Sequence, residues 1–353
     1  MSVETFSFGK VGARSTERIR LRNKNNVEVH VSNYGGIISS IRVPDNNGSF
    51  GDIVTGFDSV DGYFHPRAQY FGALIGRCAN RLADSKFPLN GKSYEVTSHL
   101  HGGLKGWNSK IWKIDDDSKD SDSEDSTIQF SLTSPDMDEG FPGEVHAKVR
   151  YTLNDVNELK IDYSATSTSD TIINLTNHSY FNLATLSTET DAVKEAMDHE
   201  VTIHASKFTP MNSSMIPTGE IRSVESTPFD FRNPHKIGER IDHSYDQLKI
   251  GNGYDHNFVL DSQDGSLSLA VEVFCPSSGR TLEVLTTEPG VQFYTGNFLD
   301  GTLKGHNEVS YPKRSFFCFE TQHFPDAPHH ENFPSIVLKA GKVYQSTTVF
   351  RFG

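Results

Sequence analysis

Cysteine is scarce in this sequence. Three cysteines, Cys78, Cys275 and Cys318, occur among 353 residues, and none belongs to a Cys-x-x-Cys unit. An odd number of cysteines cannot pair completely, and a zinc site or a disulfide framework needs closer, repeated spacing. The sequence therefore indicates neither a metal site nor a disulfide-stabilised fold, and we expect a reducing, cytoplasmic environment.

Long apolar segments are missing as well. The opening residues Met1-Ser-Val-Glu-Thr-Phe6 lack the apolar core of a signal peptide. No later run approaches the roughly 20 apolar residues that a membrane-spanning helix needs. We therefore expect no membrane partner.

Basic residues are fewer than acidic residues, 33 against 46. The formal net charge is -13, and the segment from Asp115 to Ser126 holds seven acidic residues and one lysine. An acidic chain without a basic stripe repels nucleic-acid phosphates and is not attracted to anionic lipids. We expect no nucleic-acid partner. The acidic, serine-rich segment is typical of a solvated hairpin tip.

Short strand patterns, by contrast, are abundant. The chain contains 24 Phe and 12 Tyr, residue types that favour pleated, half-buried surfaces. Polar and apolar residues alternate over residues 27–31, 145–151 and 159–165, and an Asn-Gly turn indicates a hairpin over residues 87–96. The helices that would connect the strands of a doubly wound α/β fold are missing. We predict one all-β, antiparallel domain over residues 1–353, a sandwich or barrel with few short helices.

Residues 173–183, Ile-Asn-Leu-Thr-Asn-His-Ser-Tyr-Phe-Asn-Leu, mix polar side chains with those of a buried strand. Burying a polar side chain costs roughly 1–3 kcal/mol unless it finds a partner. A strand whose polar edge faces a ligand would need both kinds of residue, and His178 can give or accept a proton near neutral pH. A structural histidine bonded to a backbone carbonyl is the alternative for His178.

Residues 315–322, Ser-Phe-Phe-Cys-Phe-Glu-Thr-Gln, form a second candidate stretch. In a strand Glu320 shares one face with Cys318 and Gln322, and the flanking phenylalanines take the other. A carboxyl group among apolar residues is desolvated, which raises its pKa and makes it a stronger base. The alternative is a carboxylate at a strand edge that points into water.

Further polar residues lie beside glycines or aromatic residues. They are Arg77, Asn80 and Arg81 after Gly76, His101 before Gly102-Gly103, Asp255 before an apolar strand, and Gln292 beside Phe293 and Tyr294. Directional donors and acceptors together with flat apolar faces suit a neutral, polyhydroxylated ligand.

Six of these motifs together give the chain a specific resemblance. It resembles the aldose 1-epimerase (galactose mutarotase) family in segments that follow the family's order and span most of the chain. The segments are Gly76-Arg-Cys-Ala-Asn-Arg81, Leu100-His-Gly-Gly103, Thr176-Asn-His-Ser-Tyr-Phe-Asn-Leu183, Tyr254-Asp-His-Asn257, Thr287-Glu-Pro-Gly-Val-Gln-Phe-Tyr-Thr-Gly296 and Phe319-Glu-Thr-Gln322.

The resemblance implies a large β-sandwich with a sugar-binding cleft on one face, and general acid and base catalysis of anomer interconversion. It implies that Glu320 is the general base and His178 the general acid, with a hexose, galactose or glucose, as substrate. The positions that match sugar-binding residues are Asn80, Arg81, His101, Asp255 and Gln292, with Ser179 and Tyr180 added from the motif of His178. No cofactor or metal is expected, and a monomer or dimer fits. The acidic segment 115–126 has no counterpart in the family.

Other functions remain open at this point. A non-catalytic sugar-binding protein could use the same polar residues. A glycosidase would need two carboxylates on either side of the scissile bond, which Asp255 and Glu320 could supply. A sugar-phosphate epimerase would need additional cations in the cleft. The sequence also leaves open whether Arg77 or Arg81 contacts the sugar.

Overall fold

The computed structural model describes residues 2–115 and 125–353. Most of the acidic segment predicted to form a hairpin tip, residues 116–124, lies outside the described residues. On either side of it, β9 (Lys113–Ile114) pairs antiparallel with β10 (Ser126–Ser134).

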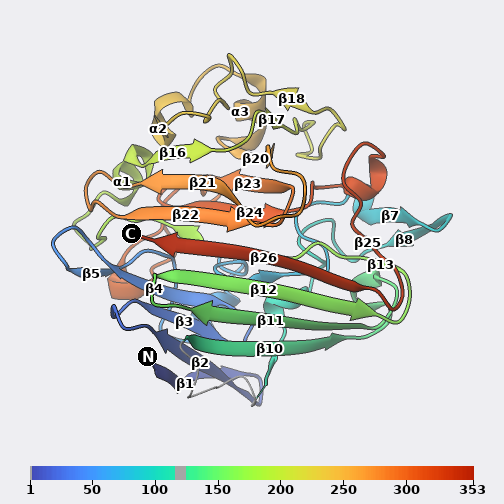
Figure 1. The fold of residues 1–353 in the computed structure, drawn as a ribbon, viewed down its shortest axis with the longest axis horizontal. Helices are drawn as coiled ribbons and strands as arrows, with labels where there is room; N and C mark the ends of the chain where they lie inside the picture. The colour runs from blue at the N-terminus through green and yellow to red at the C-terminus, as the bar shows by residue number, and fades with distance from the viewer. Residues whose placement is uncertain (1, 116–124) are drawn as a thin grey trace.

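Three antiparallel sheets make up most of the fold (Figure 1). The largest has nine strands in the order β19 (His235–Lys236), β16 (Glu200–Ile203), β21 (Ser268–Phe274), β22 (Thr281–Thr286), β26 (Val343–Phe352), β12 (Glu158–Ser167), β11 (Val145–Leu153), β10 and β9. A six-stranded sheet has the order β15 (Tyr180–Phe181), β24 (Phe317–Gln322), β23 (Gly290–Tyr294), β20 (Asp255–Val259), β17 (Lys207–Phe208) and β18 (Arg222–Ser223). A five-stranded sheet runs in chain order through β1 (Ser2–Val11), β2 (Arg14–Arg22), β3 (Glu28–Ser32), β4 (Ile38–Pro44) and β5 (Phe50–Asp52).

The remaining elements are short. Three two-stranded sheets pair β13 (Thr171–Ile172) with β25 (Val337–Leu338), β14 (Thr176–Asn177) with β6 (Leu74–Ile75), and β7 (Lys86–Leu89) with β8 (Lys92–Glu95). The α-helices in the described part of the chain are α1 (Ala192–Asp198), α2 (Ile237–Arg240) and α3 (Asp246–Gly251). None of these helices is long and apolar enough to cross a membrane. The predicted all-β, antiparallel, sandwich-like fold is confirmed, as is the hairpin over residues 87–96.

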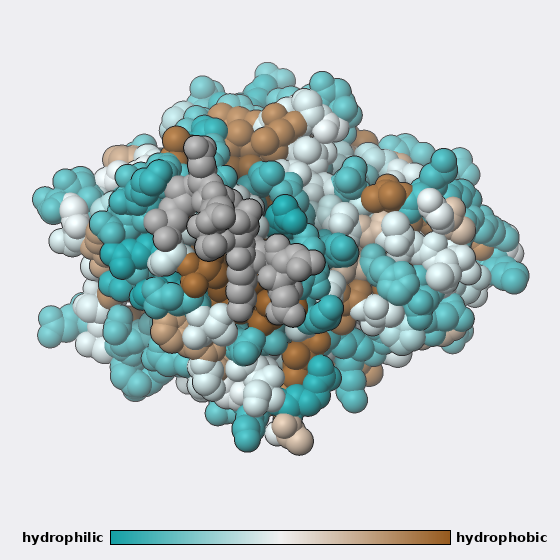
Figure 2. Space-filling view, turned by 60° about the horizontal axis from the view of Figure 1, so that its bottom comes forward, coloured by the Kyte–Doolittle hydropathy of each residue, from teal (hydrophilic) through white to brown (hydrophobic). Residues whose placement is uncertain are grey.

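The core lies between the sheets and follows from alternation along the strands. In β11 every second side chain from Val145 to Leu153 is buried, and the residues between them are exposed or half-buried. Each fully buried Val or Leu side chain contributes roughly 1.5–3 kcal/mol. The main buried cluster takes residues from all three large sheets. Hydrophilic residues dominate the face shown in Figure 2, where hydrophobic residues gather in small separate groups.

The predicted continuous strand over residues 173–183 is wrong in one respect. The segment forms two short strands: β14 pairs with β6, and β15 pairs with β24. His178 and Ser179 lie between β14 and β15. The Asn177 side chain makes this break, since its Nδ2 donates to Gly72 O (2.8 Å) and its Oδ1 accepts from Ser179 N (3.1 Å) and Oγ (2.6 Å). The change of partner strand brings His178 to face β24.

The Arg77 side chain is buried and joins two segments of the chain. Its guanidinium is buried, and its five N–H groups donate to the Ser134 hydroxyl and to the backbone carbonyls of residues 134, 135, 141 and 142. Burial lowers its pKa to about 10. Arg77 therefore ties residues 76–81 to the loop after β10, and of the two arginines left open above it is Arg81 that faces a cavity.

Replacing Arg77 by Met is expected to lower the free energy of unfolding by at least about 3 kcal/mol, because several buried carbonyls lose their donor at about 1–3 kcal/mol each. Urea unfolding measures this change. Arg22→Met, at a side chain that is 40% exposed, is the matched control and should change stability by no more than about 0.5 kcal/mol. Equal effects of the two substitutions would contradict the role given to Arg77.

Candidate active site

A cavity of about 250 Å³ opens where the six-stranded sheet meets the segments around residues 66–81 and 100–101. Its lining residues are Pro66, Arg67, Gln69, Tyr70, Asn80, Arg81, Leu100, His101, His178, Tyr180, Asp255, Tyr294, Phe298, Leu299 and Glu320. Seven predicted site residues therefore come together here from distant parts of the chain. The other two, Ser179 and Gln292, are not among the lining residues.

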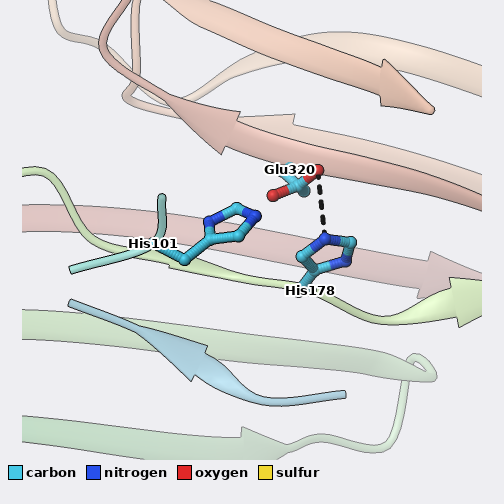
Figure 3. A group of neighbouring side chains, drawn as sticks. All are labelled: His101, His178 and Glu320. Atoms are coloured by element: carbon cyan, nitrogen blue, oxygen red, sulfur yellow. Dashed lines mark ion pairs between the residues drawn. The ribbon is translucent and has the colours of Figure 1, made fainter. Parts of the chain in front are cut away.

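His178 and Glu320 face one another in this cavity, with His178 Nε2 3.6 Å from Glu320 Oε1 (Figure 3). Both side chains are at least 95% buried. Burial raises the pKa of Glu320 well above its usual value, Asp255 raises it further, and Arg81 opposes the shift. Burial also lowers the pKa of His178 to about 3. Both shifts favour the neutral pair, in which the shared proton is on the Glu320 carboxyl group.

Two tyrosine rings lie parallel to the His178 imidazole. The Tyr180 ring is 4.9 Å away at an interplanar angle of 6°, and the Tyr70 ring is 6.0 Å away at 7°. Aromatic rings attract a cation placed over their faces. The two tyrosines would thus favour the protonated imidazolium form of His178 and offset part of the cost of burying its charge.

His101 is held as a hydrogen-bond donor. The backbone N–H of Asn80 donates to His101 Nδ1 (3.2 Å), so the neutral ring carries its proton on Nε2. The backbone N–H of His101 donates in return to Asn80 O (2.9 Å). Both residues have positive φ, +62° and +50°, and Gly102 must be glycine because a Cβ there would lie 2.1 Å from Gly76 O.

A metal ion fits this arrangement poorly. One ligand atom each from His101, His178 and Glu320 lies within 4.8 Å of the others, which is a spacing that could suit a cation. A metal on Nδ1 of His101 would displace the Asn80 N–H, and a metal on Nε2 would move the ring proton to Nδ1, against that same N–H. Either mode sacrifices the hydrogen bond that fixes the ring, so the site suits donation to a hydroxyl group better than metal coordination.

Asp255 lies at the cavity beside Arg81. Gln292 Nε2 donates to Asp255 Oδ1 (2.7 Å), so Gln292 orients this carboxyl group from behind. Burial raises the pKa of Asp255, while Arg81 and the Gln292 hydrogen bond lower it. The Ser179 hydroxyl is used locally, on Asn177 Oδ1.

Several lining residues were not predicted. Tyr70 and Arg67 belong to a segment between η1 (Val60–Phe64) and β6 whose sequence gave no periodic signal. Arg67 pairs with Asp300 (Nε–Oδ2 2.9 Å) and donates from Nη1 to Phe298 O (3.0 Å). It thereby joins the two segments that form the rim.

Comparisons with known proteins agree with this geometry. Residues 17–351 match the family model described as aldose 1-epimerase. The chain is 43% identical to galactose mutarotase of Bos taurus, with 100% of this chain and 99% of the relative covered. It is 42% identical to galactose mutarotase of Homo sapiens (99% and 98%) and 33% identical to aldose 1-epimerase of Escherichia coli K12 (95% and 94%).

Solved structures share the fold. An aldose epimerase homologue from C. elegans superposes with a TM-score of 0.82 at 28% identity, covering 96% of this chain and 99% of that one. Galactose 1-epimerase from Lactobacillus acidophilus NCFM gives 0.84 at 24% identity, with 100% and 98% covered, and shows the fold alone. Because the family model matches residues 17–351 and full-length relatives are more than 40% identical, this chain belongs to the aldose 1-epimerase family.

Proposed function

We propose that this protein is a mutarotase that interconverts the α and β anomers of D-galactose and D-glucose. The observation that carries the proposal is the buried His178–Glu320 pair, 3.6 Å apart at a cavity otherwise lined by hydrogen-bonding and aromatic side chains. Ring opening needs a base at the anomeric hydroxyl and an acid at the ring oxygen, and such a pair can supply both.

The single proton of the pair balances the reaction. In the working form Glu320 is a carboxylate and His178 an imidazolium. The carboxylate takes the proton of the C1 hydroxyl while the bond from C1 to the ring oxygen breaks, and the ring oxygen takes the proton of His178. The product is the open-chain aldehyde, with Glu320 protonated and His178 neutral. This is the position of the proton that burial of both groups favours.

Ring closure reverses these transfers. After rotation about the bond between C1 and C2, the protonated Glu320 returns its proton to the aldehyde oxygen. The free hydroxyl then attacks C1 from the other face and gives its proton to His178. Because the pair starts and ends with one proton, no exchange with solvent is needed within a turnover, and the burial of both groups does not hinder the cycle.

The other polar residues would hold the sugar. His101 Nε2–H, the Arg81 guanidinium and the Asn80 amide offer donors, and the Asp255 carboxylate offers an acceptor, all at the cavity. Aromatic rings such as Tyr294 provide flat faces for the carbon skeleton. A neutral sugar fits better than a sugar phosphate, because Arg67 at the rim is paired with Asp300 and Arg81 lies beside the Asp255 carboxyl group.

We also propose that the enzyme works in the cytoplasm. Cys78, Cys275 and Cys318 are all buried free thiols. Unpaired thiols are typical of proteins kept in reducing compartments.

Glu320→Gln should lower kcat by about 10²–10⁴-fold, because the amide cannot accept the C1 proton. Polarimetry on freshly dissolved α-D-galactose measures the rate, with the uncatalysed rate subtracted. Glu272→Gln is the matched control, since that side chain is 47% exposed on β21 and outside the cavity. Near-native turnover of Glu320→Gln would refute the assignment of the base, and a wild-type protein that left the decay of rotation unchanged would refute the function.

The pH dependence tests the shared proton. Above the raised pKa of Glu320 the pair loses its only proton, so kcat/KM should decline on the alkaline side. The charge of Asp255 contributes to this raised pKa. Asp255→Asn removes that charge, lowers the pKa of Glu320 and should move the alkaline limb to lower pH, besides weakening sugar binding.

Asp300→Asn is the control for this experiment, because Asp300 pairs with Arg67 at the rim and does not contribute to the Glu320 pKa shift. It should leave the alkaline limb where it is. A limb that stays in place in Asp255→Asn, or moves equally in both variants, would argue against Glu320 as the group that titrates.

Tyr70→Leu should reduce kcat by about 2- to 30-fold, the range expected when one cation–π contact of about 0.5–2 kcal/mol is lost from the imidazolium form. Tyr70→Phe keeps the ring and should stay within about twofold of the wild type. NMR titration of His178 gives an independent readout, with a lower imidazole pKa expected in the Leu variant only. Identical behaviour of the two variants would assign Tyr70 a purely packing role.

A further inference from the structure

A second cavity, of about 420 Å³, lies against the five-stranded sheet. Strands β2 to β5 supply Arg18, His30, Arg42 and Asp52 to its wall, and the segment that includes His306 supplies part of the remainder. It shares no lining residue with the candidate active site. It is also larger than that site, and nothing in the proposed reaction uses it.

Arg18 lacks a charge partner at this cavity. Among residues 2–115 and 125–353, no carboxylate oxygen lies within 4.0 Å of its guanidinium nitrogens, and its buried Nε makes no hydrogen bond. Its contact is with the ring of Phe8, 5.4 Å from the guanidinium carbon. The neighbouring Arg20 differs, because it pairs with Glu4 (2.5 Å) and Glu28 (3.6 Å). An arginine so placed has several donors free for an anion.

His30 adds a second set of unused groups. Both of its ring nitrogens are buried and without a hydrogen bond in the described part of the chain. Burial, followed by the charges of Arg18, Arg20, His306 and Arg42, lowers its pKa to about 4. Among the residues that the structure describes, Glu28 is the one carboxylate within 4.0 Å of His30. It lies 3.8 Å from the ring and is shared with Arg20, Arg22 and Arg42 at 3.6 to 3.8 Å. The ring is therefore neutral and has one N–H to donate in a region of positive potential.

The acidic residues of the cavity already contact other groups of the protein. Asp52 accepts from the Ser40 hydroxyl (2.5 Å) and from the backbone N–H groups of Ile41 and Val54. Asp58 Oδ1 lies 3.0 Å from His306 Nδ1.

His306 lies between an acidic side chain and a backbone carbonyl group. Its Nε2 lies 2.8 Å from the backbone carbonyl oxygen of Ser39, while its Nδ1 faces the Asp58 carboxylate. Both ring nitrogens of His306 are therefore occupied by contacts within the protein. The nearest acidic side chains of the wall, Asp52 and Asp58, thus contact other groups, and Arg18 keeps its donors free.

We propose that this cavity binds a small molecule that carries a phosphate group. Arg18 and Arg42 would donate to the phosphate oxygens in the forked geometry that guanidinium groups give, and His30 would add one neutral donor. Phe50 and Phe316, which also line the cavity, provide an apolar surface for the organic part of the ligand. The site is independent of the mutarotase proposal, because none of its residues takes part in that reaction.

Isothermal titration calorimetry at low salt, with inorganic phosphate and with phenyl phosphate, tests the proposal. The wild-type protein should bind phenyl phosphate more tightly than phosphate. Arg18→Gln should weaken binding by about tenfold or more, the usual consequence of removing a charge-assisted hydrogen bond from a charged ligand. Arg42→Gln, at a side chain that is 48% exposed, should weaken binding without risk to the fold. Arg232→Gln, at an exposed arginine paired with Asp230, is the matched control.

An Arg81→Gln variant separates the two cavities. Binding that persists in Arg81→Gln and is weakened in Arg18→Gln and Arg42→Gln supports the second cavity. Binding that is lost in Arg81→Gln instead belongs to the active site and overturns the proposal, as does the absence of heat with either ligand. Thermal unfolding of each variant within a few degrees of the wild type shows that a loss of binding is not a loss of fold.

Discussion

Desolvation of Glu320 on β24 of the six-stranded sheet is the constraint on which the surrounding site depends. A carboxyl group buried in this way is costly to ionise, so it keeps its proton until a partner or a substrate can take it. His178, equally buried, resists the second proton. Both penalties favour the neutral pair, with the shared proton on Glu320, over the ion pair in which the proton is on His178.

The strands supply this environment through their alternation. Asp255, Gln292 and Glu320 project from one face of β20, β23 and β24, where Asn257 is opposite Gln292 and Gln292 is opposite Glu320 in the register. On the other face Phe293 and Phe319 stack with ring centroids 5.0 Å apart. A polar layer with its own hydrogen bonds therefore rests on an aromatic layer that anchors it to the core.

Much of this was predictable from the sequence, and the reasons for the failures are specific. Alternation placed Glu320 on the face opposite its phenylalanine neighbours and identified β11, β12 and the 87–96 hairpin, because these depend on local pattern. The break at His178 depends on Asn177 reaching Gly72, about 100 residues away, and no local pattern reports it. The same holds for Arg77 and Arg81, which have similar neighbours along the chain. Arg77 donates to backbone carbonyls far away in the sequence, whereas Arg81 faces the cavity.

The catalytic roles came from the resemblance of six motifs to a family, whereas the geometry adds what motifs cannot give. It supplies the tautomer of His101, fixed by the Asn80 backbone, and the parallel ring of Tyr70. Neither is visible in residue spacing. The second cavity was also beyond the sequence, because Arg18, His30 and Arg42 lie on separate strands with ordinary alternation, and an arginine without a carboxylate is recognised only in three dimensions.

The two cavities are separated by one aromatic cluster. Phe71 contacts the Tyr180 ring at 4.6 Å on the active-site side and the Tyr311 ring at 5.8 Å on the other. Backbone and hydroxyl groups fix this wall, since Thr55 N–H donates to Tyr180 O and the Tyr311 hydroxyl to Gly56 O. Conformational coupling between sites requires an element with two stable arrangements. A wall that is packed and hydrogen-bonded in this way has a single arrangement. An anion in the second cavity would therefore not act on the catalytic pair through a rearrangement of this wall.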